Sequence, residues 1–320
     1  MNIKPILIIA GEPYSVFSEL LFKIFTKEKF KKPIVIIGSI DLISKQMKYL
    51  KYKIKINRIS ENYKKSQLIK NALNIINVNF RFKKTFDVIS SISKDYNKEC
   101  FELSIKLLKR KKFSGLINGP ISKKHFIKNK YYGITEYFAE KSKIKNFAML
   151  IYNKKLSVSP LTTHVPLKKV SKLISKKKLI NHIKLIKTFY KKNFNTNASI
   201  IVTGLNPHCE SNYKDSEENR IIKPAINSLK KNYSKISGPH AADSAFIKNN
   251  LKGVDVVVGM YHDQVLGPIK SIHNFDAINI TLGLPFFRIS PDHGPNNKMI
   301  GKNKSNPQSL YESIKFLDNQ

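Results

Sequence analysis

Apolar positions along the 320-residue chain fall into short runs separated by longer amphipathic stretches. The runs end in Gly, Pro, Asn or Asp, as strands do where they stop at turns. In the stretches between them, apolar residues recur three and four positions apart, which predicts helices with one buried face. We expect strands over 6–10, 34–38, 115–117, 147–151, 199–203, 254–260 and 277–282, and helices over 19–25, 100–108, 179–190 and 221–230.

This alternation of strands and helices predicts an α/β protein with a largely parallel sheet or sheets. Hydrophobic residues make up 41% of the chain, which excludes a disordered protein. No run approaches the roughly 20 uncharged apolar residues that cross a bilayer, so we expect no membrane span. The two cysteines, Cys100 and Cys209, exclude a disulfide framework. Together with the absence of a signal pattern, they predict a cytoplasmic protein.

The chain carries a formal net charge of +36, from 58 Lys and Arg against 22 Asp and Glu. Such an excess suggests binding to nucleic acid. Only five of the cations are Arg, however, and the Lys residues are spread along the chain among many Asn and Ile. A surface that contacts bases or phosphates in a bidentate manner would favour Arg. We interpret the charge as a compositional bias, and a basic nucleic-acid-binding protein without catalysis remains an alternative.

Three histidines each come just past the carboxyl end of an expected strand. His164 closes the segment 156–163, His208 follows the strand over 199–203, and His262 follows the strand over 254–260. Ligands bind at this edge in open α/β sheets. Three converging neutral imidazoles would form an open divalent-metal site, although each histidine alone is also explained without a ligand role.

Polar residues also gather between 261 and 294, in otherwise apolar sequence. Asp263 is expected either to orient an imidazole or act as a base, or to cap a helix. Lys270 and Arg288 suit a phosphate and a carboxylate, with a solvated surface position as the alternative for Lys270. Further along lie Asn279 and the segment Asp292-His293-Gly294.

Two glycine-containing segments precede these residues. The segment 115–123 has a Gly-Pro turn that could offer backbone N–H groups to an anion, and the same turn could be a plain connection. In the segment 133–136, Thr135 is either a helix N-cap or a contact to a substrate hydroxyl. Neither the G-x-G-x-x-G nor the G-x-x-x-x-G-K-[ST] motif occurs, so any dinucleotide must be held in another way.

Over nearly its whole length the chain resembles the 4-hydroxythreonine-4-phosphate dehydrogenases of vitamin B6 biosynthesis. The most specific segment is 279–288, Asn-Ile-Thr-Leu-Gly-Leu-Pro-Phe-Phe-Arg. The other matching segments are 11–13, 118–120, 133–138, 162–164, 204–208, 238–239, 242–243, 260–264 and 292–294.

The resemblance implies two α/β lobes around a cleft, as in isocitrate and isopropylmalate dehydrogenases, with NAD bound without a Rossmann domain. We expect the first lobe to hold 1–130 and about 285–320, and the second to hold 131–284 with the metal and substrate residues. The resemblance also implies a homodimer with its active site at the subunit interface and a metal site that takes histidines from both subunits. No specific nucleic-acid partner is expected.

The resemblance also implies roles for individual residues. The family's metal ligands correspond to His164, His208 and His262. Its substrate contacts correspond to Thr135, Lys270, Asn279 and Arg288, and its acidic active-site positions to Asp243 and Asp263. We assign the cofactor to Asp292, His293 and Gly294.

The implied activity is the NAD-dependent oxidation and decarboxylation of 4-phosphooxy-L-threonine to 3-amino-2-oxopropyl phosphate. The implied metal is a divalent ion such as zinc, magnesium or cobalt, and NADP is the alternative cofactor. One residue departs from the family at the substrate site, because Ile134 stands where the family has His. A sister dehydrogenase of 4-phosphoerythronate or 4-phosphothreonate is therefore an alternative.

Overall fold

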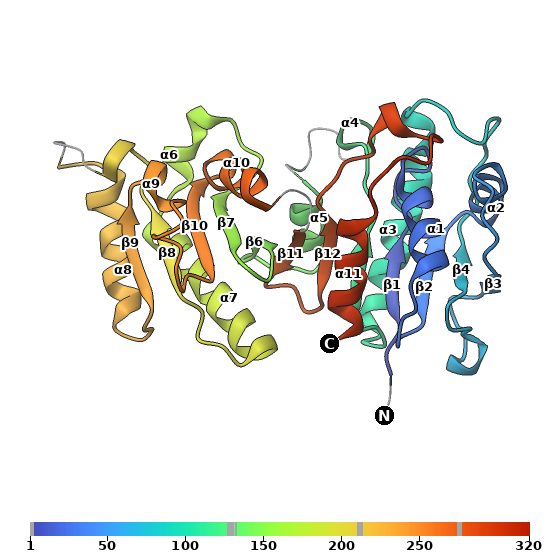
Figure 1. Ribbon diagram of the computed structural model, residues 1–320, viewed down its shortest axis with the longest axis horizontal. Helices are drawn as coiled ribbons and strands as arrows, with labels where there is room; N and C mark the ends of the chain where they lie inside the picture. Colours follow the sequence, from blue (N-terminus) through green and yellow to red (C-terminus); the bar gives the residue numbers. More distant parts are fainter. Residues whose placement is uncertain (1–2, 127–130, 132, 210–213, 274–276) are drawn as a thin grey trace. The chain divides into compact units, whose positions relative to one another are not determined.

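The computed structural model describes residues 3–126, 131, 133–209, 214–273 and 277–320 (Figure 1). The chain forms two compact units, Met1–Tyr131 with Phe286–Gln320, and Tyr132–Pro285. The first unit is therefore discontinuous in sequence. Each unit contains a sheet and helices that pack against it, so the predicted α/β class is confirmed.

The first unit is built on parallel strands in the order β3-β4-β2-β1-β5-β12. Its strands are β1 (Ile6–Ile9), β2 (Ile34–Gly38), β3 (Ile56–Ile59), β4 (Leu73–Asn77), β5 (Gly115–Asn118) and β12 (Arg288–Pro291). Its helices are α1 (Phe17–Lys27), α2 (Ile40–Tyr49), α3 (Lys94–Lys109), α4 (Lys123–Phe126) and α11 (Gln308–Asp318). Every residue of β1 is fully buried, which explains the unbroken apolar run there.

The second unit has strands in the order β11-β6-β7-β10-β8-β9. These are β6 (Ala148–Tyr152), β7 (Ser157–Thr162), β8 (Ile200–Thr203), β9 (Ile236–His240), β10 (Val256–Tyr261) and β11 (Ile278–Leu282). Its helices are α5 (Ile134–Lys141), α6 (Val170–Leu173), α7 (Lys176–Phe194), α8 (Lys223–Lys230), α9 (Ala242–Ala245) and α10 (His262–His273).

Strand direction in the second unit is mixed. Strands β7, β10, β8 and β9 are parallel to one another, whereas β6 is antiparallel to both β7 and β11. Only the residues between Tyr152 and Ser157 connect β6 to β7, and so short a connection can join only antiparallel strands. The expectation of largely parallel strands is confirmed for the first unit and is only partly right for the second.

The strand pattern of the sequence missed β3, β9 and β12, which are poorly buried or interrupted, and also the buried strand β4. Strand β3 is mostly half-exposed, with only Ile59 buried. Strand β9 contains Gly238 and Pro239, and β12 begins with a charged residue and ends with Pro291. Gly, Pro and charged residues are typical of sheet edges and strand ends, where the local apolar signal is weak. Within the described residues, no helix is long and apolar enough to span a membrane.

Candidate active site

Three of the histidines singled out above lie at one edge of the sheet in the second unit. Strands β7, β10 and β8 are neighbours in the sheet, and Tyr261 of β10 is in register with Thr162 of β7. His164 comes two residues after β7, His262 begins α10 directly after β10, and His208 lies in the turn after β8. Because these strands are parallel, their carboxyl ends meet at one edge, as the sequence predicted.

Buried hydrogen bonds tie the ends of these three strands together. The Thr162 hydroxyl donates to the carbonyl oxygen of Met260 at 2.7 Å, which joins β7 to β10. Oε1 of Gln264 accepts from the Met260 N–H at 2.6 Å and from the Thr203 hydroxyl at 2.9 Å. Nε2 of Gln264 donates to the carbonyl oxygen of Gly204 at 2.8 Å, so this side chain joins β10 to β8. The network holds the segments that carry the histidines.

The turn before His208 is held by a buried carboxylate, Glu218. Its Oε1 accepts from the N–H groups of Leu205 at 2.7 Å and of Asn206 at 2.9 Å, and its Oε2 accepts from Nδ2 of Asn206 at 2.8 Å. Burial opposes ionisation of Glu218, but these hydrogen bonds outweigh it and lower the pKa of the carboxyl group. A buried charge therefore fixes the backbone that leads to His208.

The histidines make two separate sets of contacts. The rings of His164 and His262 lie with their centroids 5.5 Å apart. Nδ1 of His262 is 2.6 Å from Oδ1 of Asp263. Nδ1 of His208 is 3.7 Å from Oδ2 of Asp243, which is longer than a hydrogen bond. The structure thus brings His164 to His262, and it brings His208 to Asp243.

The described residues of a single chain do not form a complete metal site. Among them, no group of three or more His, Cys, Asp or Glu side chains is placed to hold a metal ion. The donor chemistry nevertheless fits a divalent ion, because two imidazoles are adjacent and a third leaves the same sheet edge. The contact between Nδ1 of His262 and Asp263 directs the other ring nitrogen, Nε2, towards a ligand role.

Thr135 is not the cap of its helix. Gly133 occupies the N-cap of α5, and Thr135 is the second helical residue, with only 3% of its surface exposed. The N-cap alternative for Thr135 is therefore wrong, because the helix begins at Ile134, two residues earlier than a Thr135 cap requires. A buried hydroxyl in the first turn of α5 remains a candidate substrate contact.

Glu136, the next residue of α5, faces the segment that carries His164. Its Oε1 accepts a hydrogen bond from the Thr163 hydroxyl at 3.2 Å. Its Oε2 is buried and has no hydrogen-bond partner among the described residues. A Cβ atom placed on Gly133 would lie 2.9 Å from this oxygen and 3.2 Å from Nδ1 of His164. The missing side chain at Gly133 is what lets the carboxylate and the imidazole share this space.

Two further candidates of the second unit lie in different environments. Asn279 is on β11, opposite Ile151 of β6. Its Oδ1 atom is buried and, within the described structure, has no hydrogen-bond partner, so it is an available acceptor. Lys270 lies in the second half of α10 and is exposed.

Arg288 of the first unit is buried, with 3% of its surface exposed. It begins β12 and is in register with Leu116 of β5. Its Nε donates to Oδ1 of Asn118, at the carboxyl end of β5, at 2.7 Å. Most cations of this chain are exposed lysines, so a buried guanidinium held in one orientation indicates that its planar shape is needed for a specific contact.

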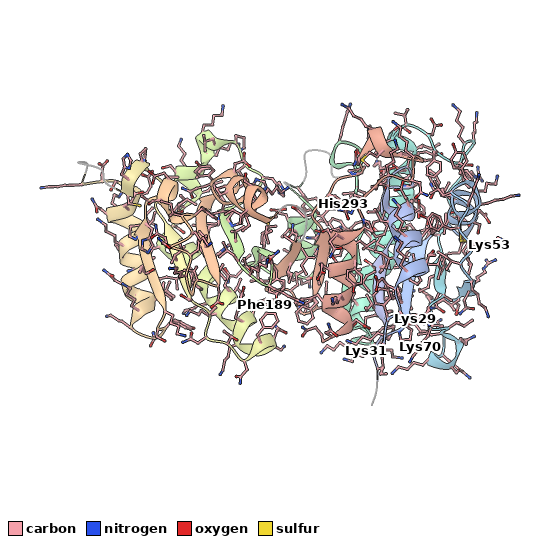
Figure 2. All side chains as sticks on the ribbon, viewed as in Figure 1. Lys29, Lys31, Lys53, Lys70, Phe189 and His293 are labelled. Carbon is pink, nitrogen blue, oxygen red and sulfur yellow. The ribbon has the colours of Figure 1, made fainter. Side chains whose placement is uncertain are left out.

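The proposed cofactor segment follows β12 in the first unit. The backbone N–H of Asp292 donates to the Ser309 hydroxyl at 2.8 Å. Nδ1 of His293, labelled in Figure 2, is 3.0 Å from the carbonyl oxygen of Gly294. Burial lowers the pKa of His293, so the ring is neutral at pH 7, and its buried Nε2 has no partner in the described part of the chain. A Cβ atom on Gly294 would meet open space.

Sequence reasoning missed the residues that support the candidate site. Each of these residues contacts a segment that is distant from it in sequence; they are Asn118, Glu136, Glu218 and Thr203. One signal was available, because the chain has only 22 acidic residues and buried ones are costly. That scarcity marks Glu136 and Glu218. Nothing in the local sequence distinguishes Asn118 or Thr203.

The segment 115–123 ends at Lys123, whose side chain lies outside the described structure.

The fold first assigns the protein to a structural class, and the comparisons then assign it to a family. Two α/β units without a glycine-rich nucleotide loop belong to the isocitrate dehydrogenase-like folds rather than the Rossmann folds. The structure of isocitrate dehydrogenase from Methylococcus capsulatus matches with a TM-score of 0.50 at 9% identity, over 98% of this chain and 84% of that one. The family model "Pyridoxal phosphate biosynthetic protein PdxA" matches residues 29–317, and the chain belongs to this family.

Individual relatives agree with this assignment. The chain is 37% identical to a 4-hydroxythreonine-4-phosphate dehydrogenase of a Sulfurihydrogenibium species, over 97% of this chain and 96% of the relative. It is 28% identical to the D-threonate 4-phosphate dehydrogenase of Salmonella typhimurium, over 99% and 98%.

A solved structure of a putative 4-hydroxythreonine-4-phosphate dehydrogenase from Salmonella typhimurium matches with a TM-score of 0.83 at 27% identity, over 99% of both chains. The predicted resemblance is confirmed. The chain is an oxidoreductase, and these comparisons favour an enzyme over a nucleic-acid-binding protein without catalysis.

Proposed function

We propose that this protein oxidises 4-phosphooxy-L-threonine and decarboxylates the product to 3-amino-2-oxopropyl phosphate. The observation that carries the proposal is the sheet edge where His164, His208 and His262 leave three adjacent strands. The relative named for 4-hydroxythreonine-4-phosphate supports this choice of substrate.

The reaction removes a hydride from the carbon next to the one that bears the amino and carboxyl groups, and a proton from the hydroxyl group on that same carbon. The ketone that forms is β to the carboxylate, so loss of carbon dioxide leaves an enolate, which takes up a proton to give the product. When bound, a divalent metal would supply a Lewis acid for the hydroxyl and the enolate, and NAD would accept the hydride.

We assign the metal to His164, His208 and His262. Imidazole ligands suit zinc or cobalt better than magnesium. A homodimer that takes histidines from both subunits is part of the proposal. Two points support it. The first is the resemblance. The second is that within a single chain His164 lies next to His262, whereas His208 lies next to Asp243.

The two aspartates receive different roles. Asp263 contacts Nδ1 of His262 at 2.6 Å, so we assign it to holding that ring in one orientation. Asp243 is 3.7 Å from His208, its side chain is 63% exposed, and its Oδ1 accepts a hydrogen bond from the Ser244 N–H at 2.9 Å, so Oδ2 faces His208 and solvent. We therefore assign the transfer of the hydroxyl proton to Asp243.

The charged groups of the substrate are assigned to Arg288 and Lys270. The planar guanidinium of Arg288, held by Asn118, suits a bidentate carboxylate or phosphate contact, and Lys270 supplies a point charge. Thr135 and the unpartnered Oδ1 of Asn279 are assigned to the polar groups of the substrate.

We assign NAD, with NADP as the alternative, to Asp292, His293 and Gly294. Two observations fit this assignment: Gly294 borders open space, and the neutral His293 keeps an unused acceptor nitrogen. The same segment has its backbone anchored by Ser309.

A substrate panel tests the proposed function. NADH formation is measured with 4-phosphooxy-L-threonine, 4-phosphothreonate and 4-phosphoerythronate, before and after exhaustive chelation and after a divalent ion is added back. We expect the highest kcat/KM with 4-phosphooxy-L-threonine, loss of activity on chelation and its return with the ion. Full activity in a verified metal-free sample would contradict the metal assignment.

A second candidate function rests on Ile134. This residue stands in the first turn of α5, beside Thr135, and a relative is named for D-threonate 4-phosphate. A preference for 4-phosphothreonate or 4-phosphoerythronate in the panel would favour that sister activity over the proposed one.

A further inference from the structure

A cavity of about 800 Å³ lies in the first unit, beside the start of β1 and the carboxyl end of α3. Three segments form it: Lys4 and Pro5 before β1, residues 61–65 after β3, and the carboxyl end of α3 with the link to β5. Figure 1 labels β1 and α3, the two elements beside which it lies. Asn118 lies at the opposite, carboxyl end of β5, so the cavity is distinct from the candidate active site.

The cavity is strongly cationic. Six of its twelve lining residues are Lys or Arg, compared with 58 of 320 in the chain. These are Lys4, Lys64, Lys65, Arg110, Lys111 and Lys112. Glu61 is the one acidic residue among the described residues that line it, and Lys106 contacts both of its oxygens, at 2.8 and 3.0 Å. This hydrogen bond lowers the pKa of Glu61, whose charge is thereby already paired.

The walls of the cavity are held in place by contacts between the segments. The guanidinium of Arg110 donates to the carbonyl oxygen of Glu61 at 2.7 Å, which ties the loop after β3 to the end of α3. The N–H of Ser114 donates to the carbonyl oxygen of Pro5 at 2.9 Å. Burial raises the pKa of Tyr63 to about 12, so its phenol is a neutral donor beside Arg110. These contacts hold the wall segments together and place the Arg110 guanidinium and the Tyr63 phenol at the cavity.

Helix capping explains only part of this charge. Cations favour the carboxyl end of a helix, which accounts for Arg110, Lys111 and Lys112 after α3. Lys4 and Lys64 come from other segments and have no such reason to be there. Like charges gathered in a concave site repel one another, and a bound anion removes that cost.

We propose that this cavity binds a compact, multiply charged phosphate compound of oligophosphate or nucleotide size. A single phosphate is small for 800 Å³, which lies in the range of metabolite sites. Several ammonium groups and one guanidinium match several phosphate groups. The rings of Tyr63 and Phe113 also line the cavity and offer a surface for a base.

The test compares two triple variants with the same change in charge. The first, Lys4→Gln/Lys64→Gln/Lys112→Gln, removes cavity lysines. The second, Lys29→Gln/Lys53→Gln/Lys70→Gln, removes exposed lysines of the same unit that do not line the cavity and are labelled in Figure 2. Titration calorimetry on the full chain with tripolyphosphate and with ATP, at two salt concentrations, gives the affinities.

We expect saturable one-to-one binding that weakens at least about tenfold in the cavity variant and stays unchanged in the other. Tighter binding of ATP than of tripolyphosphate would identify a nucleotide site, and equal binding an oligophosphate site. Equal weakening in both variants, or no saturable binding of either compound, would overturn the proposal. NADH formation should be the same in both variants, so this test is independent of the proposed function.

Discussion

The Nε atom of Arg288 donates a 2.7 Å hydrogen bond to Oδ1 of Asn118, and both side chains are buried. The contact fixes the plane of the guanidinium. Replacement by lysine keeps the charge but loses both this contact and the bidentate fork. We expect Arg288→Lys to lower kcat/KM by a factor that corresponds to a loss of about 1.5 to 3 kcal/mol in transition-state stabilisation. Steady-state kinetics test this, with the exposed Arg58→Lys as the control; an unchanged kcat/KM would make Arg288 purely structural.

The contact between His262 and Asp263 predicts an effect on metal affinity. Loss of a carboxylate that orients a metal-binding imidazole typically costs 10- to 100-fold in affinity, and we expect roughly that for Asp263→Asn. Titration of the metal-free protein with zinc or cobalt measures it without any turnover. Asp41→Asn, at an exposed position on α2, serves as the control. Equal affinities in Asp263→Asn and the wild type would contradict the role assigned to Asp263.

Gly133→Ala tests whether the carboxylate of Glu136 and the ring of His164 need the space at this position. The backbone at Gly133 is extended, so alanine is conformationally allowed and the effect is steric. The new Cβ would meet Oε2 of Glu136 at 2.9 Å and Nδ1 of His164 at 3.2 Å. We expect a clear loss of metal affinity and of kcat, with the circular dichroism spectrum unchanged.

The control for this variant is Gly267→Ala. Gly267 lies inside α10, where a Cβ atom would meet open space. Alanine there should stabilise the helix by up to about 1 kcal/mol and leave metal affinity unchanged. If Gly133→Ala and Gly267→Ala had the same metal affinity and kcat, the close contacts at Gly133 would not matter for function.

His182 predicts how stability depends on pH. It is buried in α7, its Nε2 is 2.7 Å from the Ser159 hydroxyl, and burial lowers its pKa to about 3. The unfolded chain takes up a proton below pH 6.5, whereas the folded chain does not until about pH 3. This group therefore lowers the unfolding free energy by about 1.4 kcal/mol per pH unit as pH falls through that window.

Urea unfolding at pH 7, 6 and 5 measures this contribution. In His182→Gln the slope that His182 contributes should disappear. The exposed His240→Gln should keep the wild-type slope. If His182→Gln and the wild type lost stability in parallel, His182 would be protonated in the folded protein.

Ile134→His introduces the residue that the resemblance implies at this position. Ile134 is 7% exposed at the start of α5, so an imidazole there should cost about 1 to 3 kcal/mol of stability. We expect a lower KM for 4-phosphooxy-L-threonine, because a polar group returns beside Thr135. Ile134→Val, which keeps the site apolar, should leave KM unchanged. A higher KM in Ile134→His would indicate a pocket shaped for another acid.

The sequence by itself determined the elements whose signal is local. The apolar runs that became β1, β2 and β10 are fully buried along most of their length, so their pattern is strong. The positions of His164, His208 and His262 after strands were equally local. A strand end is marked by the change from apolar to turn-forming residues, and that change is visible in any short window.

Only the tertiary structure decided which strands are neighbours and which side chains meet. Strand β10 pairs with β7 and β8, although nearly 100 residues separate β7 from β10 along the chain. The contacts of Gln264 with Thr203 and of Glu136 with Thr163 follow from that packing. The cationic cavity likewise joins three distant segments of the first unit. Such contacts depend on long-range pairing, which hydrophobic periodicity over a few residues does not encode.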